Sequence, residues 1–452
     1  MIPRLYVWSI LLEPLLFFII ADQSFLIIPT SLARIIQILV VSGLIFLFLY
    51  KLTDRKFNIL IINIKNPLYF YIFLHFFFLI IIGIFSIFVG TYDIYFQTNV
   101  VIIPNSVIFR PLFEYFIELF YIVYFFILPF YIFKSRVIVD YFFYYFRIVF
   151  LLCLVFGFID ILSIYFLDFP LIPRHITDWK FVGFRFHGIA GEPRQAYIYL
   201  VFGLAILNLK AFYYDKKMSV WWLIFVSIAI GFTQSMTAIV GLLFFILLYL
   251  SRSFLIGAGN FFRGIATPFV ALIFIILILF TSDRLIDYLE DISTVLNVLD
   301  SGEKLPYLME VQSTSIFPIY DLLVKVRNFD LLPVFFGSGL GSSSIINNIY
   351  IGGEYELKNP NSQIIKILYE GGLVGLFLII KAFLYPIKRL TNGINLKNKK
   401  TFIIYTLLLL GAFFAIRSPT IYIYLGICIV VFKLKLKLKF KQPPVSGYLS
   451  AQ

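Results

Sequence analysis

The chain has 452 residues, of which 61% are hydrophobic, 20% are aromatic and 13% are charged. Soluble globular domains carry about 25% charged residues, and a water-soluble fold of this length could not bury so much apolar side chain. The composition therefore excludes an ordinary soluble protein, and the net charge of +13 needs an explanation within a membrane protein.

Long apolar runs define the expected elements. Each run is about 20 residues long and lacks the polar–apolar alternation of barrel strands, so the runs predict transmembrane helices. In chain order the expected spans are 5–21, 33–50, 67–90, 111–133, 143–166, 195–213, 219–233, 236–251, 264–281, 362–385, 401–417 and 419–432. The predicted fold class is an all-α polytopic membrane protein with about 12 transmembrane helices.

Every second connection between these spans is basic. The basic residues are Lys51, Arg55, Lys56 and Lys65, then Lys134 and Arg136, then Lys210, Lys216 and Lys217, then Arg252 and Arg263, then Lys388, Arg389, Lys397, Lys399 and Lys400, then the lysines from Lys433 to Lys441. The positive-inside rule places this side in the cytoplasm. We therefore expect a membrane protein with both termini in the cytoplasm, whose charge suits a lipid bilayer and not nucleic acid.

The spans also divide the chain. Residues 1–281 hold nine spans, with extracytoplasmic loops near 91–110 and 167–194. A large extracytoplasmic loop follows at 282–361, then three spans at 362–432 and a basic cytoplasmic tail at 433–452. Long ordered loops are usually functional, so chemistry is expected on the extracytoplasmic side.

The first candidate segment precedes the sixth span. It contains Arg185, His187, Glu192 and Arg194, with Arg174 shortly before it. Arginine binds phosphate through a planar fork of donors, and a carboxylate or imidazole beside it can take a proton from a hydroxyl group. A positively charged surface loop with glycine turns explains the same residues.

Two further segments carry candidate residues. The Gly/Ser-rich stretch 329–344 is either an anion-binding nest or a turn between helices. Further on, Asn361 lies at the start of a span, and Glu370 lies about two turns inside it, where a carboxylate needs a polar cavity or a partner. Arg417 lies at an extracytoplasmic helix end and Arg327 lies in the large loop. Snorkelling or helix pairing is the alternative role for such residues.

Four short motifs follow one another between residues 185 and 375. They are an Arg-x-x-Gly element with a Glu/Pro-rich turn, a helix pair around a Thr/Ser-rich turn, a Gly-x-Gly-x-Gly element, and an Asn-Ser helix entry followed by Glu-x-Gly. The matching stretches are 185–188 with 191–193, 232–241, 337–341, and 361–363 with 370–375. Together they resemble the O-antigen ligase/polymerase superfamily of membrane glycosyltransferases. Ligases of this superfamily carry a histidine where this chain has Pro360, so the resemblance favours a polymerase of the Wzy type.

The resemblance implies a GT-C-like helical fold. It also implies a location in a bacterial inner (cytoplasmic) membrane, undecaprenyl-diphosphate-linked oligosaccharides as donor and acceptor, and a polysaccharide chain-length regulator as a candidate partner. The sequence contains no Asp-x-Asp metal motif, which favours a mechanism without metal or other cofactor. The catalytic candidates are Glu192 and His187. The candidates for binding the diphosphate or the sugars are Arg185, Arg194, Arg174, Arg327, Arg417, Asn361 and Glu370.

Two alternatives stay open. A ligase of the same superfamily would transfer the finished glycan to lipid A core. A flippase or other transporter is equally compatible with twelve spans and two cytoplasmic termini. Transporters usually show two similar halves and broken helices near the midplane, and the polar residues of this chain gather instead on one face of the membrane.

Overall fold

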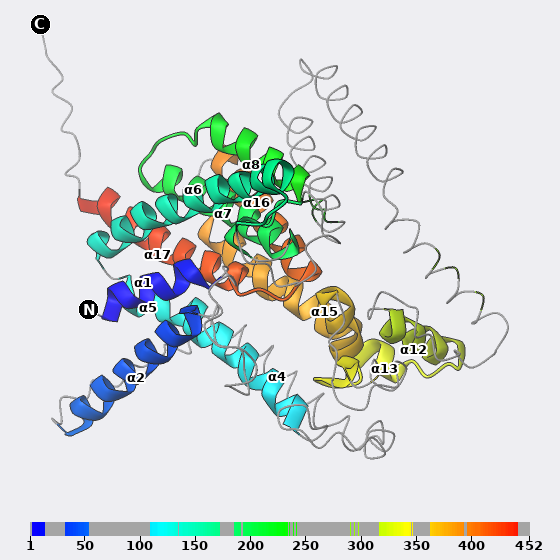
Figure 1. Ribbon diagram of the computed structural model, residues 1–452. Coiled ribbons are helices and arrows are strands. Elements are labelled where there is room, and N and C mark those ends of the chain that lie inside the picture. The colour runs from blue at the N-terminus through cyan, green and yellow to red at the C-terminus, as the bar shows by residue number, and fades with distance from the viewer. Residues whose placement is uncertain are drawn as a thin grey trace, which may run out of the picture.

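The computed structural model describes residues 2–13, 32–53, 109–133, 135–171, 185–190, 193–233, 316–344, 362–392 and 396–441, with a few isolated positions between them. Every regular element in these stretches is helical (Figure 1). The elements are α1 (Ile2–Leu12), α2 (Leu32–Thr53), α4 (Phe109–Phe120), η1 (Tyr121–Ile127), α5 (Leu128–Ile132), α6 (Arg136–Leu167), η3 (Gly188–Ala190), α7 (Pro193–Tyr213), α8 (Val220–Phe232), α12 (Ile316–Arg327), α13 (Leu332–Phe336), α15 (Gln363–Leu390), α16 (Leu396–Ala415) and α17 (Thr420–Lys441). The expected all-α class is thereby confirmed.

Within the described stretches, five helices are long and apolar enough to cross a membrane. They are Glu114–Ile132, Arg136–Leu167, Pro193–Tyr213, Gln363–Leu390 and Asn398–Ala415. Shorter apolar helices occupy Ile2–Leu12, Ile35–Leu47 and Val220–Phe232. The protein is therefore a multi-pass membrane protein, while the spans expected at 67–90, 236–251 and 264–281 lie almost wholly outside the described residues.

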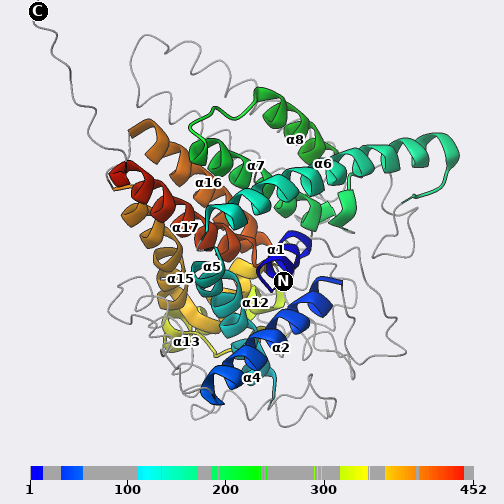
Figure 2. The ribbon, with the colours of Figure 1, turned by 90° about the vertical axis from the view of Figure 1, so that its left-hand side faces the viewer.

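Helix α7 forms the centre of the bundle. It is apolar on all sides and is buried along most of its length, which is typical of a helix surrounded by other helices. It packs against α16, α17 and α8, and Figures 1 and 2 show these helices around it. By contrast, α6 exposes Leu152, Phe156 and Ile159 on one face, as expected where a helix meets lipid.

Helices α4, η1 and α5 form one continuous helix with wider turns in its middle. The η1 segment is a π-helix, and Pro129 follows it at the start of α5. Proline lacks the N–H that an α-helix would require here, so a local change of helix type relieves the mismatch. Helix α17 crosses at this point through Gly426, where a Cβ would lie 2.7 Å from the carbonyl oxygen of Phe125.

Contacts between helix ends show which ends of the helices lie together in the bundle. Tyr214, just after α7, donates a hydrogen bond of 2.5 Å to Asp140 near the start of α6. Lys435, near the end of α17, lies 2.5 Å from Asp215 after α7. Helices α15, α16 and α17 alternate in direction through short connections. Those basic connections that lie in the described stretches, at the start of α6, after α7, between α15 and α16 and at the end of α17, therefore gather at one end of the bundle.

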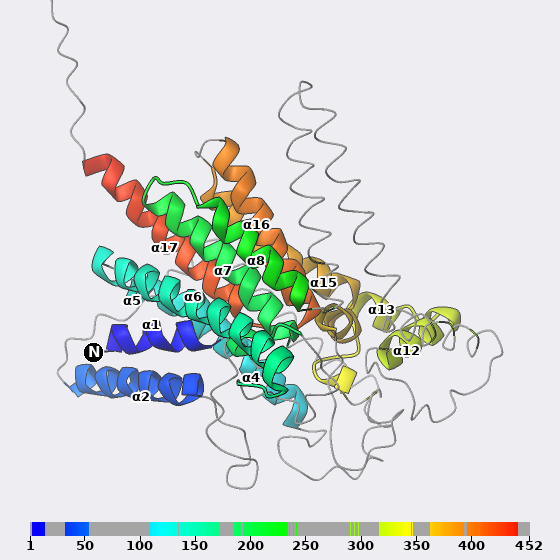
Figure 3. The ribbon, with the colours of Figure 1, turned by 45° about the horizontal axis from the view of Figure 1, so that its top comes forward.

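Two pairs of helices lie at the edge of the central bundle, although α1 contributes buried side chains to the same core. Helices α1 and α2 lie side by side, and Gln37 donates a hydrogen bond to the buried carboxylate of Glu13 between them (Figure 3). Helices α12 and α13 lie beyond the start of α15 in Figures 1 and 3 and contact that helix. The start of α15 is thus flanked by parts of the expected large loop.

Candidate functional site

Helix α15 is interrupted at Gly372, where φ is 64° and ψ is −169°. A Cβ at this position would lie 2.3 Å from the carbonyl oxygen of Phe335, so glycine is required. Gly337 is constrained in the same way, with a φ of 84° and a Cβ position 2.2 Å from the carbonyl oxygen of Glu370. Two glycines therefore let the backbone of α15 touch the backbone of the loop after α13.

The interruption frees carbonyl groups that a continuous helix would use, and the loop supplies donors for them. The backbone N–H of Ser338 donates to the carbonyl of Tyr369 at 2.8 Å, and the N–H of Gly339 donates to the carbonyl of Glu370 at 3.0 Å. These amides are thus engaged by a broken helix and do not face an anion. For Ser338 and Gly339, a turn between helices is therefore the interpretation of the Gly/Ser-rich stretch that fits.

The side chain of Glu370 is buried beside this turn, with 4% exposure. It accepts a hydrogen bond of 2.5 Å from the hydroxyl of Ser343 and another from the backbone N–H of Gly341. The ammonium group of Lys366 lies 4.0 Å from the same carboxylate. The partner that a carboxylate at this depth requires is therefore present.

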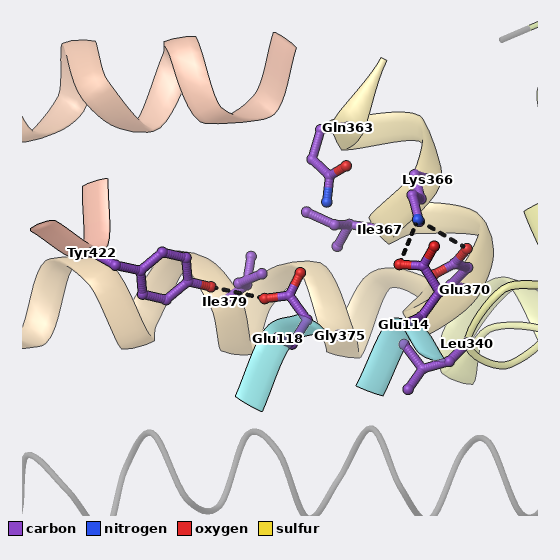
Figure 4. Close-up of a pocket in the computed structure, with 11 residues that line it drawn as sticks. Glu114, Glu118, Leu340, Gln363, Lys366, Ile367, Glu370, Gly375, Ile379 and Tyr422 are labelled. Carbon is purple, nitrogen blue, oxygen red and sulfur yellow. Dashed lines mark hydrogen bonds and ion pairs between the residues drawn. The ribbon is translucent and has the colours of Figure 1, made fainter. Parts of the chain in front are cut away.

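An ion network continues from Lys366 to other helices (Figure 4). Its Nζ atom lies 2.9 Å from Oε2 of Glu114, which also accepts a hydrogen bond from Nη1 of Arg417. Nη2 of Arg417 lies 2.7 Å from Oε1 of Glu118, and the hydroxyl of Tyr422 donates to Oε2 of Glu118 at 3.1 Å. Helix α4 is thereby joined to the starts of α15 and α17.

Arg417 lies in the connection between α16 and α17 and is mostly buried. Burial alone lowers the pKa of its guanidinium, but the carboxylates of Glu118 and Glu114 raise that pKa by more, so it stays above its ordinary value. The guanidinium also lies 5.5 Å from the centre of the Tyr121 ring. Arg417 is therefore a permanent cation whose charge is already matched by two carboxylates.

A second chain of contacts extends the network toward α12. Lys325 forms an ion pair of 2.7 Å with Asp321, and the hydroxyl of Tyr369 donates to the same carboxylate at 2.7 Å. Lys325 also donates to the hydroxyl of Ser338 at 3.2 Å. Helix α12 is thus fastened to the turn that supports Glu370.

The balance of charge limits what this cluster can bind. Three carboxylates, on Glu114, Glu118 and Glu370, face two cations, on Lys366 and Arg417. The three carboxylates and Lys366 line a pocket with a volume of about 40 Å³, which is room for a few water molecules. Carboxylates accept hydrogen bonds from hydroxyl groups and repel phosphate, so a single hydroxyl group at the edge of this cluster suits it better than a diphosphate.

A second group of candidate residues surrounds Arg185, which is 9% exposed. Its Nε donates to the carbonyl of Thr233 at 3.0 Å, and the N–H of Phe186 donates to the carbonyl of Phe232 at 2.8 Å. The ring of Phe186 rests on Gly157 of α6, where a Cβ would lie 2.3 Å from it. The segment before α7 is therefore held against α6 and the end of α8.

The remaining predicted residues have different surroundings. His187 is buried next to Arg185, Arg194 is half-buried in the first turn of α7, and Arg327 is exposed in the last turn of α12. The predicted residues outside the described stretches are Arg174, Glu192 and Asn361. Of the predicted set, the structure thus joins Arg185 with His187 in one segment, and it links Glu370 to Arg417 through Lys366 and Glu114.

Sequence reasoning missed Lys366, which joins the two parts of the ion network. A signal was available, because Lys366 and Glu370 are four residues apart in an apolar helix and so lie on one face. Glu114 and Glu118 have the same spacing in α4. No sequence pattern, however, indicates that these two faces meet.

Comparisons with protein-family models, with curated proteins and with solved structures found no match. A function must therefore be argued from the residues and geometry of the site itself.

Proposed function

We propose that the protein polymerises undecaprenyl-diphosphate-linked oligosaccharide repeat units into O-antigen or a similar surface polysaccharide, on the outer face of a bacterial inner membrane. In each cycle, the bond between the anomeric carbon of the growing glycan and its phosphate oxygen breaks. A hydroxyl oxygen of a new lipid-linked repeat unit forms the glycosidic bond, and its proton passes to a base. Undecaprenyl diphosphate leaves.

One observation supports this proposal: motifs that lie far apart in the sequence are joined in pairs by hydrogen bonds. Arg185 is hydrogen-bonded to Thr233, and the turn at 337–339 is hydrogen-bonded to Tyr369 and Glu370. These contacts join the first of the four resembling motifs to the second, and the third to the fourth. Both pairs belong to the end of the described bundle opposite the basic connections.

The residues around Arg185 and the residues around Glu370 differ in charge, so they suit different parts of the reaction. Arg185 and Arg194 supply cationic donors for the departing diphosphate, whose negative charge grows as the bond breaks. His187, beside Arg185, or Glu192 takes the proton of the acceptor hydroxyl. Glu370 and its neighbours hold sugar hydroxyls, because their net negative charge disfavours phosphate. The proposal includes twelve spans in a GT-C-like arrangement with both termini in the cytoplasm.

The test is reconstitution of the purified protein in proteoliposomes with its lipid-linked repeat unit. The proposal predicts a ladder of products that differ by one repeat. Arg185→Ala should abolish the ladder, while Arg136→Ala, at the basic end with 60% of its side chain exposed, should leave it intact. A ligase would give no ladder, and a normal ladder from Arg185→Ala would contradict the site assignment.

A transporter remains the second candidate because of one specific observation, the break of α15 at Gly372 beside buried charges. Interrupted helices with buried ionisable groups form substrate and ion sites in many transporters. The same proteoliposomes separate the two functions. A transporter moves the intact lipid-linked unit between leaflets without lengthening it, whereas a polymerase lengthens the glycan without requiring transfer between leaflets.

A further inference from the structure

A second pocket lies at the basic end of the bundle, away from the ion network. It is formed by the end of α7, the connection to α8, the start of α8 and the first turns of α16, and its volume is about 520 Å³. Pockets of about 300–1,000 Å³ are typical of sites for small molecules. The proposed function gives this pocket no role.

The charges that line this pocket are predominantly positive. Lys216 and Lys217 both line it, and the carboxylate of Asp215 lies beside them. That carboxylate is already matched by Lys435, whose Nζ lies 2.5 Å away. The two lining lysines therefore present an excess positive charge to any ligand.

Neutral donors surround these lysines. The polar lining residues are Asn208 of α7, Ser219 before α8, and Asn398 and Thr401 of α16. Ser219 is exposed, and its hydroxyl makes no hydrogen bond that caps α8. Hydroxyl and amide groups beside two lysines are the donors that a phosphate group requires.

The other part of the lining is apolar. Val220 and Leu223 of α8 and Phe402 and Ile404 of α16 form this part. Trp221 is adjacent in sequence and 66% exposed, and exposed tryptophans at helix ends mark the level of lipid headgroups. A ligand with a charged head and an apolar body matches this lining better than a free phosphate compound.

We infer that this pocket binds an anionic glycerophospholipid. Its phosphate lies against Lys216 and Lys217, and an acyl chain runs along Val220 and Leu223. Basic pockets between transmembrane helices bind the headgroups of anionic lipids by the same combination of charge and apolar contact. Because three helices and a connecting loop form the pocket, a bound lipid fastens the end of α7 to the start of α16.

The experiment uses the purified full-length protein in a neutral detergent, and native mass spectrometry counts the bound lipids. Phosphatidylglycerol should bind at one saturable site, and phosphatidylcholine should bind more weakly. The double variant Lys216→Ala/Lys217→Ala should lower the affinity for phosphatidylglycerol by roughly tenfold to thirtyfold. The matched variant Lys388→Ala/Arg389→Ala removes two charges from the same end outside the pocket and should retain the affinity.

The outcomes that overturn the inference are distinct. Equal binding of phosphatidylglycerol and phosphatidylcholine would show that the headgroup charge is not recognised. Equal binding by the wild type and by the Lys216/Lys217 double variant would place the lipid elsewhere. Competition by millimolar inorganic phosphate alone would indicate a soluble phosphate ligand instead. The melting temperature of each lipid-free variant checks its folding. The measurement needs no glycan substrate, so its failure leaves the polymerase proposal untouched.

Discussion

The ammonium group of Lys366 lies 2.9 Å from a carboxylate oxygen of Glu114, and both side chains are almost completely buried. Removing one partner of a buried ion pair costs more than the pair itself contributes, because the other charge stays without compensation. Here the consequence is larger than for an isolated pair, since Glu370 also relies on Lys366. The network should therefore be sensitive to single substitutions.

Lys366→Met should strongly destabilise the protein. The substitution leaves three buried carboxylates against the single cation of Arg417, and we expect a loss of about 3–5 kcal/mol, measured as a lower Tm in detergent. Adding Glu114→Gln should recover part of this loss, because it removes one uncompensated charge. Lys381→Met is the matched control, since Lys381 is exposed on the same helix. Equal Tm values for the two lysine variants would contradict the role of the network.

Much of the fold could be predicted from the sequence, because in a bilayer an apolar run of sufficient length must be helical. The spans expected at 111–133, 195–213 and 219–233 agree closely with the helices found. Helix ends were less predictable. Helix α6 begins earlier than expected, at Arg136, because aromatic residues of its first turns pack into the core. Helix α17 continues through lysines to Lys441, since alternating Lys and Leu are good helix formers.

The candidate site was only partly predictable. The sequence indicated that Glu370 needs a partner but did not identify Lys366 or Ser343, because the partners of a buried group depend on packing between distant segments. Arg417 was expected to be accessible to a diphosphate, and instead it pairs with two carboxylates of α4. The break at Gly372 was also hidden, since adjacent glycines do not reveal which one adopts a positive φ.

Gly372→Ala should disturb the junction between α15 and the turn before it. The positive φ strains an alanine, and its Cβ would collide with the carbonyl of Phe335. We expect a loss of about 1–3 kcal/mol from the backbone strain, with a further loss from the collision. Gly411→Ala in α16 is the control, because nothing lies within 4 Å of its Cβ position. It should be neutral or raise the Tm slightly. Similar Tm changes in both variants would contradict the proposed packing.

Gly157→Ala tests whether the position of Arg185 matters for the proposed reaction. The added methyl group overlaps the ring of Phe186 and pushes the segment that carries Arg185 away from α6. Overpacking should cost about 1–3 kcal/mol, and the product ladder should shorten by more than this stability loss explains. Gly231→Ala of α8 has open space around its Cβ position and should keep a normal ladder. Long products from both variants would argue against a catalytic role for this segment.

Cysteine labelling tests which end of the bundle faces the cytoplasm. The native cysteines Cys153 and Cys428 have exposed fractions of 1% and 0%, so the folded wild type should not react with a membrane-impermeant maleimide. Phe329→Cys places a thiol at a position that is 86% exposed and should react in intact cells from which the outer membrane has been removed. Lys388→Cys, at the exposed end of α15, should react only after the inner membrane is opened.

The reverse pattern has a definite consequence. Lys388→Cys reacting first would place Glu370 and Arg185 on the cytoplasmic side, because both belong to the opposite end of the bundle. Lipid-linked repeat units are joined outside the cytoplasm in the proposed reaction, so glycan polymerisation would then be untenable. The charge network would remain, and a transporter with an interrupted α15 would become the better account. A reversed labelling order of the two thiols would therefore exclude glycan polymerisation before any substrate is identified.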